Sequence, residues 1–134
     1  MIEIRGTTTL VGLLGWPTSH SLSPPMQNAG FAALGLDWAY VPLPTPPDRL
    51  ADAVRGLAAT GFAGANVTIP HKQAVLSLCD ELDDVAQRAG SVNTLVLRDG
   101  RVLAQPRLQG QAGRSGAIEA GTAGAVTLRL EIGV

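Results

Sequence analysis

The chain has 134 residues, an apolar content of 46% and a formal net charge of −1, from 10 basic and 11 acidic residues. This size and composition are ordinary for one globular domain with a single core. The balanced charge argues against nucleic acid as a partner, because nucleic-acid binding normally needs a basic face or stripe. The longest apolar runs fall short of the ~18 to 20 residues that a membrane helix needs, so we expect no membrane association.

Cys79 is the single cysteine, so no internal disulfide can form, and the N-terminus has no basic segment followed by an apolar run and a cleavage site. We therefore expect a reducing, cytoplasmic setting. Lys72 is the only lysine beside nine arginines. An ammonium group can be tuned to release its proton and a guanidinium cannot, so this lysine suggests proton-transfer chemistry, with chance retention as the alternative.

A buried strand and a helix are predicted near the N-terminus. Thr9 to Gly15 is a short apolar run closed by glycine, which is typical of a strand rather than of a longer helix. After a loop, Ser23 and Pro24 form an N-cap residue followed by proline, which predicts a helix that ends at Gly35. The apolar residues that fall roughly on one face of this helix are Met26, Ala29, Ala33 and Leu34.

Two more strands flank a second predicted helix. Trp38 to Leu43 is rich in aromatic and β-branched residues, and Pro42 suggests that this strand lies at an edge or is ending. The helix that follows has apolar residues at helical spacing and Gly61 after its end. Ala63 to Ile69 is the next predicted strand, and Pro70 can open a short helix after it.

A hairpin is predicted at the end of this pattern. Ser91 to Arg98 returns to strand after a short helix that ends at Gly90. Asp99-Gly100 favours a two-residue turn, because both positions tolerate positive φ, and the chain should double back through Val102 and Leu103. The whole order predicts an α/β fold, with an open, mostly parallel sheet covered by helices on both faces and ending in a β-hairpin.

The pattern changes at residue 105. Residues 106–124 are rich in Gly, Ala, Gln and Arg and sustain no helical or strand periodicity. We therefore predict one domain over residues 1–104 and a poorly ordered, non-homologous tail over residues 105–134. Val126 to Ile132 alternates apolar and polar residues and is compatible with one more strand.

Three polar clusters follow strands or begin helices, where open α/β sheets place their ligands. Ser19 to Ser23 offers hydroxyls beside a helix start, which can bind an anionic or hydroxylated ligand; a loop with a capping serine is the alternative. Asn66 to Lys72 offers an amide, a hydroxyl and an ammonium group, which suit a small polyol or carboxylate; a strand end with a solvated lysine is the alternative. In Gly90 to Thr94, Asn93 starts a strand, where it serves either a ligand or a local turn.

These clusters carry a family resemblance when they are taken together. Residues 15–24 read GWPTSHSLSP with Asn28 later in the helix, residues 66–72 read NVTIPHK, and residues 90–94 read GSVNT. In this order and spacing they resemble the shikimate dehydrogenase family, and the resemblance covers about residues 9–104. It implies the substrate-binding domain of an NADP-dependent oxidoreductase that interconverts 3-dehydroshikimate and shikimate, in aromatic amino acid biosynthesis.

The resemblance also implies roles for single residues. Ser21 and Ser23 match the serine pair that binds the substrate carboxylate, and serine at both positions resembles shikimate-preferring rather than quinate-preferring members. The residues that match those hydrogen-bonding the ring substituents are Asn66, Thr68 and Asn93. His20, His71 and Cys79 receive no role, and no metal is implied.

Lys72 matches the catalytic lysine of the family, which contacts the substrate and acts on its hydroxyl with a partner aspartate. The family carries that aspartate in an Asn-Thr-Asp segment after the hairpin, whereas residues 105–110 here read QPRLQG and no aspartate follows Asp99. The chain also contains no Gly-x-Gly-x-x-Gly, the pattern that seats a dinucleotide pyrophosphate. We therefore expect that NADP does not bind this chain alone and that its catalytic machinery is incomplete.

Two classes of function remain open from the sequence. The first is an enzyme fragment that provides the substrate domain of a shikimate dehydrogenase. The second is a non-catalytic module that binds shikimate or quinate. A decayed gene fragment, for example from a frameshift near residue 104, is a further alternative. The expected partners are shikimate and 3-dehydroshikimate, and whether the chain forms a homodimer stays open.

Overall fold

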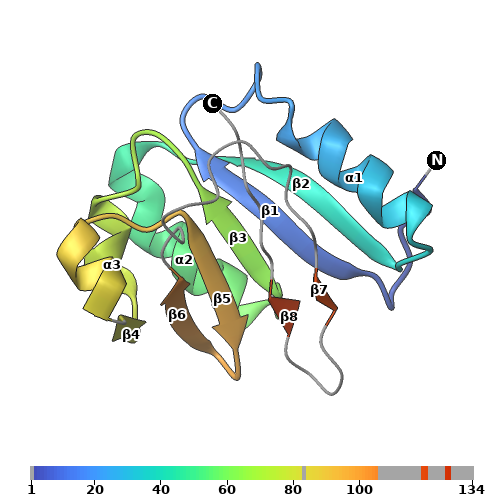
Figure 1. The fold of residues 1–134 in the computed structure, drawn as a ribbon. Helices are drawn as coiled ribbons and strands as arrows, with labels where there is room; N and C mark the ends of the chain where they lie inside the picture. Colours follow the sequence, from blue (N-terminus) through green and yellow to red (C-terminus); the bar gives the residue numbers. More distant parts are fainter. Residues whose placement is uncertain (1, 83, 106–118, 121–125, 128–134) are drawn as a thin grey trace.

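The computed structural model describes residues 2–82, 84–105, 119–120 and 126–127, and its main body is one sheet with helices packed against it (Figure 1). The strands of this sheet are β1 (Thr9–Gly15), β2 (Trp38–Pro44), β3 (Gly64–Val67), β4 (Glu81–Leu82), β5 (Thr94–Arg98) and β6 (Arg101–Gln105). The helices are α1 (Ser23–Ala33), α2 (Leu50–Ala59) and α3 (Asp84–Ala89), with 3-10 helices at Pro47–Arg49 and Ala74–Leu78. Within these ranges no helix is long and apolar enough to cross a membrane.

The strand order in the sheet is β2-β1-β3-β5-β6-β4. Strand β1 is parallel to β2 and β3, β6 is parallel to β4, and β5 is antiparallel to both of its neighbours. All strands of this sheet except β5 therefore run in the same direction. The predicted fold class, a mostly parallel α/β sheet, is confirmed.

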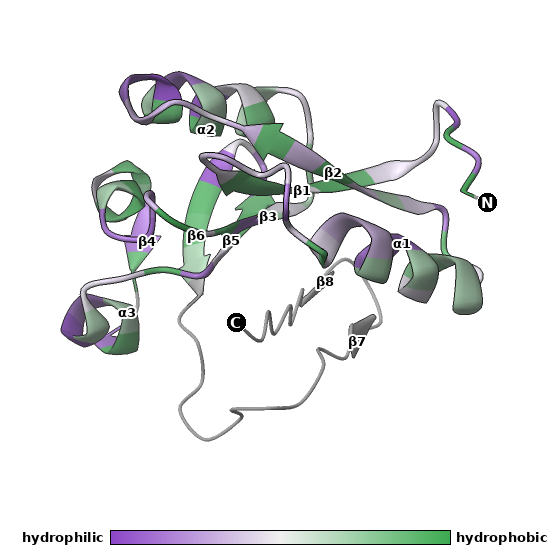
Figure 2. Cartoon of the chain, turned by 90° about the horizontal axis from the view of Figure 1, so that it is seen from above, coloured by the Kyte–Doolittle hydropathy of each residue, from purple (hydrophilic) through white to green (hydrophobic). Residues whose placement is uncertain are grey.

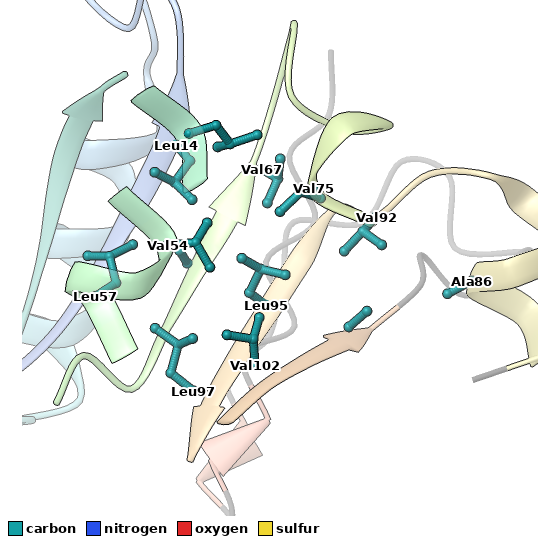
Figure 3. Packing of buried hydrophobic residues seen from close by; sticks show 13 residues of the cluster. Leu14, Val54, Leu57, Val67, Val75, Ala86, Val92, Leu95, Leu97 and Val102 are labelled. Atoms are coloured by element: carbon teal, nitrogen blue, oxygen red, sulfur yellow. The ribbon is translucent and has the colours of Figure 1, made fainter. Parts of the chain in front are cut away.

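Helices cover both faces of the sheet, because the side chains of β1 alternate between two apolar cores. Figure 2 shows α1 and α2 on opposite sides of the sheet. Val11 and Leu13 pack with Phe31 of α1, whereas Leu14 packs in a larger cluster with Leu57 of α2. Figure 3 shows this larger cluster, which spans α2, β3, β5 and β6.

The predicted hairpin is present between β5 and β6. Asp99 has φ 53° and Gly100 has φ 74°, and the strands pair from Arg98 opposite Arg101 onward. Two consecutive positive φ values are what a two-residue turn between twisted strands requires. The Asp-Gly pair is therefore the local cause of this turn.

Helix α1 differs from the prediction at its start and in the face that it buries. Its N-cap is Leu22, with Ser23 as the first helical residue. The buried residues are Ser23, Gln27 and Phe31, whereas Met26 and Leu34 are exposed. The ring of Phe31 lies 5.7 Å from that of Trp38 on β2, so this aromatic pair is part of the face that the helix buries.

The segment after β3 also differs from the prediction. Pro70 does not open a helix, because the N–H of His71 donates to the carbonyl of Thr68 at 2.9 Å and closes a tight turn there. The 3-10 helix begins only at Ala74. Lys72 consequently lies in a turn and not in the first turn of a helix.

Most of the tail predicted for residues 105–134 lies outside the described residues. The described part contains a separate pair of short antiparallel strands, β7 (Glu119–Ala120) and β8 (Val126–Thr127). Strand β8 covers the first two residues of the stretch Val126 to Ile132, whose alternation is compatible with a strand.

The centre of the larger core gives a direct test of this packing. Leu95 is fully buried among Val54, Val67 and Val102 (Figure 3). Leu95→Ala should lower the free energy of unfolding by about 2–5 kcal/mol, because it removes apolar contacts and leaves a cavity. Urea denaturation followed by circular dichroism measures the change. The control is Val85→Ala at an exposed position of α3, for which we expect a change within about 0.5 kcal/mol; equal losses in both variants would contradict the packing.

Candidate functional site

The topology brings the three polar clusters to one edge of the sheet. Strands β1 and β3 run parallel, so the segments that follow them leave at the same end. Strand β5 is antiparallel to β3 with Asn66 opposite Thr94, so the segment that enters β5 lies at that end too. Carboxyl ends of parallel strands are where open α/β sheets bind ligands. We call this the carboxyl edge; it contains residues 16–23, 68–73 and 91–94.

Backbone hydrogen bonds join these segments directly. The N–H of Trp16 donates to the carbonyl of Ile69 at 3.2 Å, which ties the loop after β1 to the turn after β3. The N–H of Val92 donates to the carbonyl of Lys72 at 2.9 Å, and the N–H of Val67 donates to the carbonyl of Asn93 at 2.8 Å. The main chains that carry Lys72 and Asn93 are therefore fixed relative to each other.

Gly15 permits the close approach of two of these segments. A Cβ atom at this position would lie 2.5 Å from Cγ2 of Thr68 and 3.3 Å from Cγ2 of Thr18. The first distance is too short for two carbon atoms, so only glycine fits while Thr68 stays in place. The end of β1 thus needs glycine for steric reasons and not because of a positive φ.

The two serines of the first cluster lie at the start of α1. The N–H of Ser23 donates to Oγ of Ser21 at 3.2 Å. The side chain that bonds the start of the helix is therefore that of Ser21, whereas Ser23 was predicted to cap it. Ser23 is 2% exposed, and its hydroxyl has no hydrogen-bond partner among the described residues. An unpaired buried hydroxyl costs about 1–3 kcal/mol, so a polar partner from outside the described chain would relieve this cost.

The remaining predicted residues differ in their exposure. Thr68, Lys72 and Asn93 are half-buried, whereas Asn66 is only 1% exposed. The amide of Asn66 is bonded inside the protein, because its Oδ1 accepts from the Tyr40 hydroxyl at 2.9 Å and its Nδ2 donates to Oγ1 of Thr94 at 3.2 Å. The structure therefore brings Ser21, Ser23, Thr68, Lys72 and Asn93 to one edge and places the Asn66 side chain in the protein interior.

Sequence reasoning missed three polar side chains beside this edge. His71 is buried, and its Nε2–H donates to the carbonyl of Thr45 at 2.8 Å, which ties the turn of Lys72 to the end of β2. Tyr40 joins β2 to Asn66 through its hydroxyl. Gln27 is buried one helical turn after Ser23. No local pattern marks these residues, although a histidine beside the lone lysine was one available signal.

The charges around the edge leave Lys72 without an acidic partner in the described chain. Every ion pair there joins an arginine to an acidic residue, and none includes Lys72. No group of three potential metal ligands occurs among the described residues. Burial, followed by the charge of Asp80, raises the pKa of the Cys79 thiol to about 11, so it stays protonated near neutral pH and is a poor nucleophile.

The described residues do not fit a nicotinamide dinucleotide. Such a cofactor needs a glycine-rich turn between a strand and a helix, with the helix N-terminus aimed at the pyrophosphate. The connection from β1 to α1 instead contains Trp16, Pro17 and two serines, and the one from β2 to α2 contains Thr45 and two prolines. The described part of the chain thus offers ligand-binding groups without a dinucleotide site.

Comparison with known proteins agrees with this geometry. A family model described as the shikimate dehydrogenase substrate binding domain matches residues 13–95, a range that includes the Ser21 loop, Lys72 and Asn93. The chain belongs to this family. Its matched range ends within β5, inside the sheet described above.

Relatives within the family are longer than this chain. Shikimate dehydrogenase (NADP(+)) of Geobacter sp. (strain M21) is 55% identical over 99 residues, which cover 74% of this chain and 34% of the relative. The enzyme of the same name from Rubrobacter xylanophilus is 57% identical over 102 residues, which cover 75% and 36%. The chain thus spans about a third of the length of the curated relatives that it matches.

A solved structure supports the fold. Shikimate 5-dehydrogenase from Listeria monocytogenes, crystallised in complex with shikimate and NAD, is 40% identical to this chain with a TM-score of 0.72. The match covers 75% of this chain and 35% of that protein. The six-stranded α/β sheet is therefore the fold of the family's substrate-binding domain.

The close approach at Gly15 can be tested with two matched variants. Gly15→Ala should destabilise the protein by about 1–3 kcal/mol, because the new Cβ forces Thr68 out of place. Gly56→Ala in α2 meets nothing within 4 Å and should stabilise it by about 0.5–1 kcal/mol. Chemical denaturation of both variants measures these changes, and a stabilising Gly15→Ala would refute the steric role.

Proposed function

We propose that this chain binds shikimate and 3-dehydroshikimate at the carboxyl edge, as the substrate-binding domain of an NADP-dependent shikimate dehydrogenase. The observation that carries the proposal is the convergence of Ser21, Ser23, Lys72 and Asn93 on one edge in a chain of this family. The Listeria monocytogenes protein was crystallised with shikimate, which supports this choice of ligand. The proposed setting is the cytoplasm, where Cys79 stays a free thiol.

The two ends of the ligand meet different groups in this proposal. Ser21 and Ser23 bind the carboxylate beside the N-terminus of α1, where the helix dipole favours negative charge. The hydroxyl of Ser23, which has no hydrogen-bond partner in the part of the chain that the structure describes, then gains one. Thr68 and Asn93 bind ring hydroxyls, since both are half-buried donors at the same edge.

Lys72 is the proposed proton-transfer group at the reacting hydroxyl. The carbonyl of Lys72 accepts a hydrogen bond from the N–H of Val92, so the side chain extends from a backbone position that is fixed. The described residues supply no acid for it and no seat for NADP, so the proposal assigns ligand binding to this chain and derives no hydride transfer from it. Binding without turnover is thus the form of the proposal that this chain supports best.

The binding part is tested by titrating the ¹⁵N-labelled chain with shikimate and following amide shifts by NMR. We expect saturable shifts at the carboxyl edge, with the Kd raised about ten- to hundredfold in Ser21→Ala and Lys72→Ala, because each loses a charge-assisted hydrogen bond. Arg98→Ala, at an exposed position beside the hairpin turn, is the control and should keep the wild-type Kd. Quinate, titrated in parallel, should bind more weakly. A well-dispersed spectrum with no shifts would refute the proposal.

The lack of turnover has its own measurement. Shikimate and NADP added to the chain alone should give no rise in NADPH absorbance, because the described residues include no dinucleotide site. The full-length Geobacter relative under the same conditions is the positive control. A shikimate-dependent rise that disappears in Lys72→Ala would show instead that the chain is catalytically competent.

A further inference from the structure

Three side chains, those of Tyr40, Asn66 and Thr94, are hydrogen-bonded in series across the sheet, and the side chain of Asn28 bonds the main chain of Tyr40. Asn28 of α1 bonds the main chain of Tyr40 on β2 twice, since its Nδ2 donates to the carbonyl at 2.9 Å and its Oδ1 accepts from the N–H at 2.8 Å. The Tyr40 hydroxyl donates to Oδ1 of Asn66 on β3, and Nδ2 of Asn66 donates to Oγ1 of Thr94 on β5. We call these four residues the Tyr40 relay. It links helix α1, which begins with Ser23, to strands β2, β3 and β5.

The relay spans a strand that does not take part in it. Strand β1 lies between β2 and β3, so the side chains of Tyr40 and Asn66 together bridge two strand spacings, about 10 Å. Tyrosine covers most of this distance because its side chain is long and rigid and has a polar tip. Burial raises the pKa of Tyr40, so the phenol stays protonated and keeps its hydrogen for Asn66.

Polar atoms at this position need an explanation, because the surroundings are apolar. Tyr40 belongs to the buried cluster with Val11, Leu13 and Phe31, where phenylalanine would fill the same space. The strands around Asn66 are already joined by their main chains. A buried amide costs free energy unless it is fully bonded, so packing alone does not account for this network.

The two ends of the relay lie beside the two ends of the proposed ligand site. Asn28 is in the same helix as Ser23, and Thr94 directly follows Asn93. The relay therefore connects the helix that begins with Ser23 to the strand that follows Asn93. A ligand that touches both ends gains affinity when their separation is fixed in advance.

We propose that Tyr40 and Asn66 are positioning residues, which hold Asn93 and Thr94 at a fixed separation from Ser21 and Ser23 for ligand binding. The role rests on the proposed function. It assigns Asn66 an indirect part, in which the amide acts through Thr94 and does not touch the ligand. It also gives Tyr40 a part in binding that its sequence position did not indicate.

The test uses shikimate titrations of the full chain by NMR, with Tyr40→Phe, Thr94→Val and the double variant. Tyr40→Phe removes one hydroxyl and should raise the Kd about three- to tenfold. Both changes break the same relay, so the Kd of the double variant should equal that of the single variant that binds shikimate more weakly. The two increases in Kd should not multiply. Phe31→Leu in the same cluster is the control: it should lower the melting temperature and leave the Kd unchanged.

The outcomes separate this role from the proposed function. If the wild-type chain binds and Tyr40→Phe binds equally well, if the two effects multiply, or if Phe31→Leu weakens binding as much, the positioning role is wrong. An isotope-filtered NOE between shikimate and the Asn66 amide would also overturn it, by making Asn66 a contact residue. Absence of binding by the wild type refutes the proposed function and this role together. Should Tyr40→Phe fail to fold, Thr94→Val and the wild-type NOE experiment still decide.

Discussion

The position of β3 between β1 and β5 is the constraint on which the site depends. Parallel pairing with β1 and antiparallel pairing with β5 send three segments, far apart in sequence, to a single edge. The contact of Gly15 with Thr68 then sets how closely two of these segments approach. With β5 parallel to β3, the segment that enters β5 would lie at the opposite end of the sheet. The polar residues are useful only because the apolar strands place them together.

Local signals in the sequence predicted much of the fold. The apolar run of β1 has the predicted bounds, and the Asp99-Gly100 turn has the predicted positive φ values, because both depend on neighbouring residues alone. The predicted N-cap of α1 and the predicted helix at Pro70 were wrong. In both places a local hydrogen bond, to Ser21 or from His71, forms in place of the expected pattern.

The sequence predicted which residues form the candidate site but not the hydrogen bonds that join them. Family resemblance pointed to the residues that the structure brings to the carboxyl edge. The interior bonds of Asn66 depend on Tyr40 and Thr94, which lie 26 and 28 residues away in sequence. No periodicity or turn pattern carries information over such a separation. Buried polar contacts between strands are therefore the part of this site that only three-dimensional structure supplies.

The bond between Asn28 and Tyr40 also has a consequence for how the protein behaves among its own copies. Strand β2 ends the sheet, and alternate residues of an edge strand point their N–H groups outward, where a strand of another molecule could pair with them. Asn28 occupies the outward N–H and carbonyl of Tyr40, and Pro42 and Pro44, the next residues in that alternation, have no N–H at all. From Tyr40 to its end this edge offers no free donor, which makes it a poor template for a strand of another molecule.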